Sequence, residues 1–309
     1  MKNKRMDIYD LKVKPIERIE SASQDQVLKL VTEARRPLIF SGLSSDFEFL
    51  NQWNLDFFET LDSMVPVQEP EPDGVNYFIK YNRIPIKDFV SRIRAGENLY
   101  IGAREIMKNL GERSDKDGLG ELATKLKVPA WVDRSLIYSA NLWVGAGNNH
   151  TLLHYDPWNS ILMLAEGKKD FIVLPEKETP KVYPYGVFNF RSLYLGKVLH
   201  SKIRPLTVQK RYQERFSKAE GFRGSVAAGE MIFIPAGFWH YVKSSNLNIG
   251  INFFVHTKDR SIHLSQPLRS YWIKDNITLW PVRMIWKWKS RLFRTIRYFF
   301  PKNPGVRAS

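Results

Sequence analysis

The sequence predicts a mainly β protein, a sandwich or barrel flanked by an α/β N-terminal region and a helical C-terminal region. The first observation is a series of short segments between residues 135 and 262 that are rich in β-branched and aromatic residues. Gly, Pro and Asn interrupt them at roughly ten-residue spacing, which is typical of an all-β domain. The second is a mixture of helical and strand-like patterns before residue 135, and the third is a helical pattern after residue 263.

The N-terminal region alternates between the two kinds of element. Residues 24–36 place apolar residues at helical spacing, and "PLIFSGL" follows as a short strand. Residues 46–64 favour a helix and "MVPVQEP" a strand. The stretch "IKDFVSRIRAGE" predicts another helix, "NLYIG" a short strand, and a further helix is expected to begin near Arg104.

The β-rich core contains the segments "SLIYSANLWVGAG", "HTLLHYDP", "SILMLAEG", "KDFIVLPE", "GSVAAGEMIFIPAG", "WHYVKSS" and "NIGINFFVH". Residues 183–223 interrupt them with little strand character, and an insert of that length is typical of a lid or binding loop. We therefore divide the chain into flanking elements (1–134), a core with this insert (135–262) and a basic helical region (263–309).

Composition excludes several classes of function. The chain has 309 residues, 43% of them hydrophobic, which suffices for a substantial core. The absence of cysteine excludes disulfides, Cys-ligated zinc, iron–sulfur clusters and thiol nucleophiles. The first twenty residues lack the apolar run of a signal peptide, and no stretch approaches about 18 continuous apolar residues. We expect a cytoplasmic protein.

The net charge of +15 predicts an affinity for polyanions, whether nucleic acid, anionic lipid or acidic protein. Residues 281–309 contribute eight Lys and Arg and no acid. A helix there would gather Trp288, Leu292 and Ile296 on one face and basic residues on the other. Residues 281–300 would suit peripheral contact with an anionic membrane, but packing or homodimer formation through C-terminal helices is favoured.

The stretch "TLLHYDPWN" places His154 and Asp156 two residues apart on a strand, so both side chains point to one face. A single buried histidine is most often an ordinary core residue. A second one follows in "GEMIFIPAGFWHYV", where Met231–Ile234 is expected to be a buried strand and His240 to open the next strand. Two histidines and one carboxylate form the facial triad of non-haem Fe(II) oxygenases.

The ordered motifs "TLLHYDPWNSILMLAEGKKDFIVLP", "AAGEMIFIPAGFWHYVKS" and "INFFVH" resemble the cupin-type JmjC oxygenases. The nearest subgroup is the one that contains the asparaginyl hydroxylase acting on hypoxia-inducible factor. The likeness runs from about Tyr100 to His256, with a weaker match at "RPLIFSGL". It implies a double-stranded β-helix (a cupin or jelly-roll fold) that binds Fe(II) and 2-oxoglutarate.

The resemblance also implies roles for individual residues. The expected iron ligands are His154, Asp156 and His240, and the expected contacts of 2-oxoglutarate are Lys169, Thr151, Tyr100 and Asn252. Lys169 would pair with the distal carboxylate, with a solvated charge beside Lys168 as the alternative. Ser160, next to Asn159, stands where the hydroxylase has an asparagine.

Two further sets of residues have structural alternatives. Phe238 and Trp239 either form a wall of the pocket or pack in the core. His150, His200, His256 and His263 are expected to be surface or core residues without a role in the site.

The implied reaction uses O₂ and 2-oxoglutarate to hydroxylate a protein or peptide side chain, with release of succinate and CO₂. A tRNA base or other nucleic acid is an alternative substrate, as is a methylated lysine, which hydroxylation would demethylate. A non-catalytic, ligand-binding cupin is the alternative outside enzymes. The basic insert, with seven Lys and Arg against two Glu over residues 202–223, would suit an acidic partner or be an ordinary solvated loop.

Overall fold

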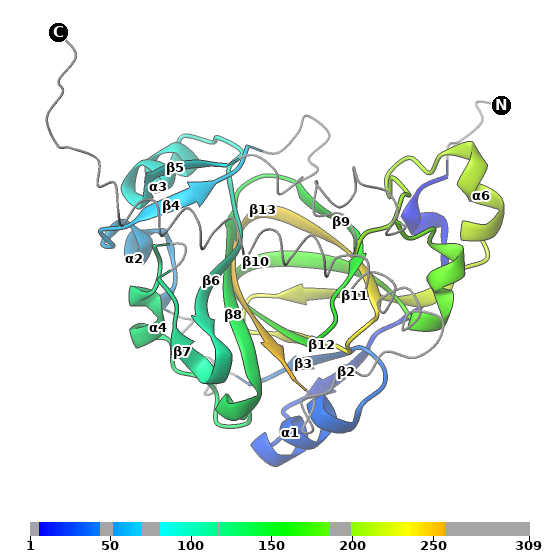
Figure 1. Ribbon diagram of the computed structural model, residues 1–309, viewed down its shortest axis with the longest axis horizontal. Coiled ribbons are helices and arrows are strands. Elements are labelled where there is room, and N and C mark those ends of the chain that lie inside the picture. Colours follow the sequence, from blue (N-terminus) through cyan, green and yellow to red (C-terminus); the bar gives the residue numbers. More distant parts are fainter. Residues whose placement is uncertain (1–5, 44–51, 70–80, 116–117, 186–198, 257–309) are drawn as a thin grey trace, which may run out of the picture.

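The computed structural model describes residues 6–43, 52–69, 81–115, 118–185 and 199–256. Most of its strands belong to one eleven-stranded sheet that rolls around an interior space (Figure 1). Its main path runs β2-β3-β12-β10-β13-β8-β6-β7, with β1, β9 and β11 paired outside that path. The predicted mainly β class is confirmed.

The N-terminal region mixes helices and strands, as predicted, although β1, β2, β5, β7 and α4 were not among the predicted elements. They are η1 (Ile8–Asp10), β1 (Lys12–Pro15), β2 (Glu17–Glu20), α1 (Gln24–Glu33), β3 (Leu38–Ser41), α2 (Leu55–Glu59), β4 (Met64–Val67), β5 (Asn82–Pro85), α3 (Ile86–Arg94), β6 (Tyr100–Lys108), η3 (Asn109–Gly111), β7 (Glu112–Arg113) and α4 (Glu121–Lys125). The helix α1 begins where the Ser23 hydroxyl accepts a hydrogen bond from the Gln26 N–H at 3.2 Å. Strand β3 then pairs with β12, which joins this region to the core.

The helix predicted to begin near Arg104 is wrong. Strand β6 continues without interruption to Lys108 and pairs with β8 along most of its length. Buried Ile106 and Met107 pack into the main core cluster there. Pairing along the sheet edge therefore outweighs the local helical preference of these residues.

The core elements are η4 (Arg134–Leu136), β8 (Ile137–Gly145), β9 (Asn149–Tyr155), β10 (Asn159–Leu174), η5 (Glu176–Lys181), α6 (Lys210–Phe216), β11 (Glu220–Ala227), β12 (Met231–Ile234) and β13 (Trp239–Val255). The strand β11 starts inside the segment (183–223) that was predicted to be an insert with little strand character. It pairs with both β1 and β10, and these partners lie far away in sequence.

Two long strands make the sheet roll. The segments "SILMLAEG" and "KDFIVLPE", predicted as two strands, form the single strand β10, and "WHYVKSS" and "NIGINFFVH" form the single strand β13. The two long strands pair with each other along almost their whole length. Their register shifts between Leu164 and Lys168, around Gly167 at φ +85°. Before that bend β10 pairs with β12, and after it with β11. Each long strand therefore contributes to both walls of the interior.

The alternation of side chains along these strands separates the interior from two outer cores. Inward-facing Leu162, Leu164, Phe171 and Val173 belong to one apolar cluster between the walls. Outward-facing residues pack against the helices α1–α4 on one side. On the other side they pack against the N-terminal segment and α6. The interior cluster fills only part of the space between the walls and leaves a pocket.

The predicted helical region 263–309, with its proposed membrane or dimer contacts, lies outside the described residues. Within the described ranges, no helix is both long and apolar enough to cross a bilayer.

Candidate metal centre

His154, Asp156 and His240 converge at one end of the interior pocket. Their ligand atoms all lie within 4.8 Å of one another. His154 on β9 and His240 on β13 are direct partners in the antiparallel register, and Asp156 follows β9 immediately. The two imidazole rings have centroids 4.1 Å apart, and His240 Nε2 lies 3.5 Å from Asp156 Oδ2.

Backbone hydrogen bonds orient both imidazoles. His154 Nδ1 lies 2.7 Å from the carbonyl oxygen of Leu152, and His240 Nδ1 lies 3.0 Å from that of Phe238. Because a carbonyl only accepts, each Nδ1 must carry the proton and donate. Each Nε2 is then left with a lone pair for a metal, which is the usual arrangement of ligating histidines.

The electrostatics of the three residues also suit a cation. Burial lowers the pKa of His240 well below its ordinary value, and the neighbouring His154 lowers it further, so His240 is neutral. Burial raises the pKa of Asp156, an effect that His154 opposes. A bound divalent cation would compensate the buried carboxylate and accept the two imidazoles as ligands. The donor set therefore fits Fe(II), which is bound by imidazole and carboxylate in facial triads.

Lys169 lies deeper in the same pocket. It is 3% exposed, and its Nζ donates to the Ser244 hydroxyl at 2.5 Å. Its register partner Ser244 is four residues from His240 along β13, or about 13 Å of strand. Burial lowers the pKa of Lys169 to about 7. A solvated charge, the alternative considered for Lys169, is found at the neighbouring Lys168 instead. The Lys168 side chain is 57% exposed, and its Nζ lies 4.0 Å from Asp170 Oδ1.

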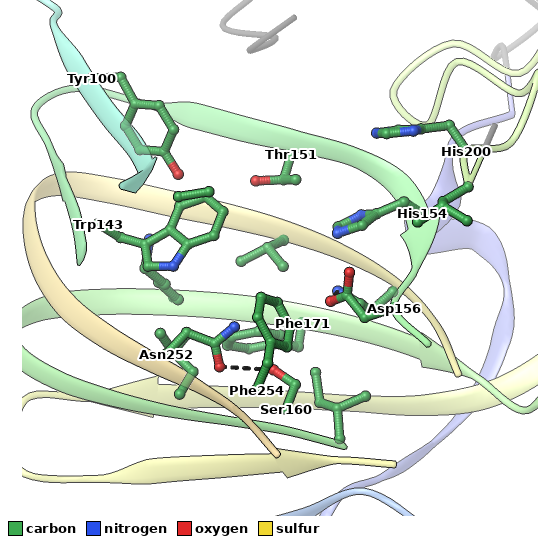
Figure 2. Close-up of a pocket in the computed structure, with 17 residues that line it drawn as sticks. Tyr100, Trp143, Thr151, His154, Asp156, Ser160, Phe171, His200, Asn252 and Phe254 are labelled. Carbon is green, nitrogen blue, oxygen red and sulfur yellow. Dashed lines mark hydrogen bonds and ion pairs between the residues drawn. The ribbon is translucent and has the colours of Figure 1, made fainter. Parts of the chain in front are cut away.

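Thr151 faces the same pocket because β9 contains a bulge. His240 pairs with His154, but Val242, two residues further along β13, pairs with Thr151, three residues back along β9. Strict alternation would have put Thr151 and His154 on opposite faces. The extra residue returns both side chains to the pocket (Figure 2).

The other predicted contacts lie around the same space. Burial raises the pKa of Tyr100 far above the ordinary value, an effect that the neighbouring Thr151 hydroxyl opposes. Asn252 accepts a hydrogen bond from the Ser160 hydroxyl at 2.9 Å (Figure 2). Of the two neighbours Asn159 and Ser160, only Ser160 lines this pocket. The Asn159 side chain instead accepts from the Ala236 N–H at 2.9 Å.

The pocket is a cavity of about 230 Å³ with a largely apolar wall. All seven residues predicted for the site line it. Lining residues that carry no predicted role include Ala103, Trp143, Leu162, Phe171, Leu199, His200, Ile234, Val242 and Phe254.

Of the two alternatives for Phe238 and Trp239, core packing is confirmed and the pocket wall is wrong. Trp239 points to the opposite face of β13 from His240, where it packs on Tyr155 and donates to Thr179 Oγ1 at 2.9 Å. Phe238 packs in the interior cluster without lining the pocket. The aromatic wall comes from Trp143, Phe171 and Phe254 instead (Figure 2).

His200 lines the pocket, although we expected it to lie outside the site. Its ring stacks on His154 with centroids 5.3 Å apart, and the two residues form a β-bridge. Nothing around His200 in the sequence marks it, because it reaches the site only by the folding of the insert onto β9. Of the other histidines, His150 and His256 lie outside this pocket, as expected.

A model of the cupin-like domain family matches residues 24–261, most of the chain. The protein therefore belongs to the cupin-like domain family, of the JmjC type, and this part of the resemblance is confirmed. The nearer likeness to the asparaginyl hydroxylase stays a prediction.

Several curated proteins are similar over most of this chain. Lysine-specific demethylase JMJ31 of Arabidopsis thaliana is 21% identical, over 77% of this chain and 49% of its own length. Human tRNA wybutosine-synthesizing protein 5 is 23% identical, over 78% of this chain and 77% of its own. Human bifunctional peptidase and (3S)-lysyl hydroxylase JMJD7 is 25% identical, over 71% of this chain and 77% of its own length. The chain thus spans about half the length of the first of these relatives, the demethylase JMJ31.

Proposed function

We propose that this protein is an Fe(II)- and 2-oxoglutarate-dependent oxygenase that hydroxylates a side chain of a protein or peptide. The observation that carries the proposal is the position of a buried lysine in the same apolar cavity as the two histidines and the aspartate. A metal site alone would not require a cation deeper in the cavity, whereas a dicarboxylate that also binds the metal would.

The polar side chains divide between the metal and the cosubstrate. The triad of two histidines and one aspartate would hold Fe(II), which with 2-oxoglutarate supplies the oxidising chemistry. Lys169 and Thr151 would bind the distal carboxylate, and the Ser244 hydroxyl would orient the ammonium group. Tyr100 and Asn252 would fix the cosubstrate laterally, while the aromatic wall of the pocket excludes water.

The lining of the cavity favours an aliphatic target group. Apart from the residues assigned to metal and cosubstrate, the cavity wall offers chiefly apolar side chains such as Leu199 and Ile234. Reading the edge of a nucleobase would need several hydrogen-bonding groups. One relative is named a lysyl hydroxylase, which supports a protein substrate. Two others are named a lysine-specific demethylase and a tRNA wybutosine-synthesizing protein, and these names correspond to the alternative substrates, methylated lysine and tRNA.

The test is release of succinate from 2-oxoglutarate in the presence of Fe(II), O₂ and candidate peptides or tRNA. We expect His154→Ala and Asp156→Ala to abolish turnover while the circular dichroism spectrum stays unchanged. The control Lys168→Ala removes the exposed neighbour of Lys169 and should retain turnover. Full activity of either triad variant would refute the ligand assignment.

A further inference from the structure

The insert after residue 183 is attached directly to the strand that bears the first histidine of the triad. The Tyr155 N–H donates to the Leu199 carbonyl at 3.1 Å, and the Ser201 N–H donates to the Leu153 carbonyl at 2.8 Å. Leu199 and His200 thereby line the pocket. The described end of the insert, residues 199–218, therefore starts at the pocket wall.

The same segment continues outward into a second layer. The Lys202 N–H donates to the Tyr183 carbonyl at 2.9 Å, and the Tyr183 ring packs on Tyr212 of α6 with centroids 4.6 Å apart. The buried Phe216 anchors α6 in the outer core cluster. The helix α6 is thus fixed relative to the pocket through a short chain of contacts.

This part of the surface is strongly basic. Its exposed cations, which we call the insert surface, are Arg204, Lys210, Arg211, Arg215 and Lys218. Glu214 is the single acid in the sequence between residues 199 and 218. Among the described residues, no carboxylate lies within ion-pair distance of Arg204, Lys210 or Arg211, and Glu214 lies 3.9 Å from Lys218. Such a cluster costs self-repulsion, which an anionic partner would relieve.

We propose that the insert surface binds an acidic stretch of the substrate polypeptide, next to the residue that enters the pocket. This inference rests on the proposed function and names the kind of peptide it would take. Four residues, at most about 14 Å of chain, separate His200 at the pocket from Arg204 of the insert surface. An extended peptide with its target side chain in the pocket therefore has carboxylates within reach of the cations.

The aromatic residues of this surface favour a peptide over single-stranded RNA. RNA binding would require open ring faces on which bases stack. The Tyr183 ring packs against Tyr212 and has the Arg215 guanidinium over it at 5.4 Å, and that of Arg211 lies over Tyr212 at 4.7 Å. Both rings are half-buried and covered and Phe216 is buried, so the described residues 199–218 offer charge without a stacking platform.

The test is fluorescence anisotropy of a labelled octapeptide of glutamate added to the full chain at low salt, without metal or 2-oxoglutarate. Octaglutamine and octauridylate serve as comparison probes. The test variant is Arg204→Glu/Lys210→Glu/Arg211→Glu. The matched control, Lys29→Glu/Arg35→Glu/Lys87→Glu, changes the net charge equally at exposed positions on or beside α1 and α3, away from α6 (Figure 1).

We expect the test variant to bind the acidic peptide at least about tenfold more weakly, and the control to change the dissociation constant less than about threefold. Equal losses in both variants would overturn the proposal in favour of a general effect of net charge. Tighter binding of octauridylate, lost in the same variant, would overturn it in favour of RNA. The Arg→Gln and Lys→Gln form of the variant should weaken binding by an intermediate factor, which separates loss of charge from misfolding.

This measurement is independent of the proposed chemistry. A protein that releases no succinate but binds the acidic peptide through these residues would disprove the oxygenase and leave the docking surface intact. Normal succinate release without binding of the acidic peptide would disprove the docking surface and leave the oxygenase intact.

Discussion

Lys169 is the residue whose environment says most about the pocket. It is almost fully buried among apolar side chains, and its one described hydrogen-bond acceptor is the Ser244 hydroxyl. A buried ammonium without a counter-charge is unfavourable, which is why burial lowers the pKa of Lys169 to about 7. A carboxylate bound beside it would restore its charge and raise that pKa.

The affinity for 2-oxoglutarate should therefore depend on pH through Lys169. Below pH 7 the empty site already carries the ammonium, but above pH 7 binding must take up a proton. We expect the dissociation constant to rise by up to about tenfold per pH unit above about pH 7, as long as the lysine is protonated in the complex. Calorimetric titration at several pH values would measure this slope.

Two variants serve as controls for that dependence. Lys169→Arg keeps a permanent charge and should remove the slope, and Lys169→Ala should weaken binding at every pH. A slope that persists in Lys169→Arg would assign the proton to another group.

At the scale of single elements, the site depends on departures from regular β-structure. The bulge in β9 brings Thr151 to the face of His154, and the bend in β10 near Gly167 lets one strand serve two walls. Gly145 on β8 is a third example. A Cβ at this position would lie 2.5 Å from Cδ2 of Tyr100, its register partner on β6. The absent side chain leaves room for the Tyr100 ring.

Gly145→Ala should displace the Tyr100 ring from its place beside Thr151. We expect 2-oxoglutarate affinity to fall by about tenfold, because one polar contact is lost and the ring intrudes on the cavity. The measurement is the same calorimetric titration. Gly229→Ala, at a turn outside the pocket with φ +79° where the added methyl meets no atom within 4 Å, controls for a general loss of stability. Equal affinity in Gly145→Ala and the wild type would contradict this role of the glycine.

These irregularities also explain how much the sequence could predict. Alternation predicts that His154 and Asp156 share a face, and the turns on either side of the apolar run Met231–Ile234 predict the late strand with His240. Thr151 does not, because a bulge is invisible in the pattern, and only the family resemblance indicated it. His200 and the strand character after Arg104 depend on pairing between segments distant in sequence, so local preference gave no signal or the wrong one.

At the scale of the whole molecule, the two outer cores hold the walls of the pocket together. The N-terminal segment contributes Ile8 and Leu11 to one outer core, and β1 pairs with β11. The helices α1–α4 cover the other. These cores carry the stability, whereas the pocket carries a buried cation that opposes it.

The cost of that cation should appear in the free energy of unfolding. In the unfolded chain Lys169 binds its proton up to about its ordinary pKa of 10.5, but in the folded chain only to about 7. Between these values the unfolded state holds more protons, so the contribution of Lys169 to stability rises with pH and is most unfavourable below pH 7. By contrast, that contribution is absent from Lys169→Met. We therefore expect this variant to be more stable than the wild type at about pH 7, with the difference shrinking toward about pH 10.5.

Urea unfolding of both proteins without 2-oxoglutarate would measure that difference. A gap that is constant across this pH range would mean that Lys169 does not lose its proton on folding.

The central claim is that His154, Asp156 and His240 together bind one metal ion. Anaerobic calorimetric titration with Fe(II) tests it most directly, with the wild type compared with Asp156→Asn and His240→Ala. We predict one ion per wild-type chain, and binding in each variant weakened by at least about tenfold. Unchanged stoichiometry and affinity in both variants would contradict the claim.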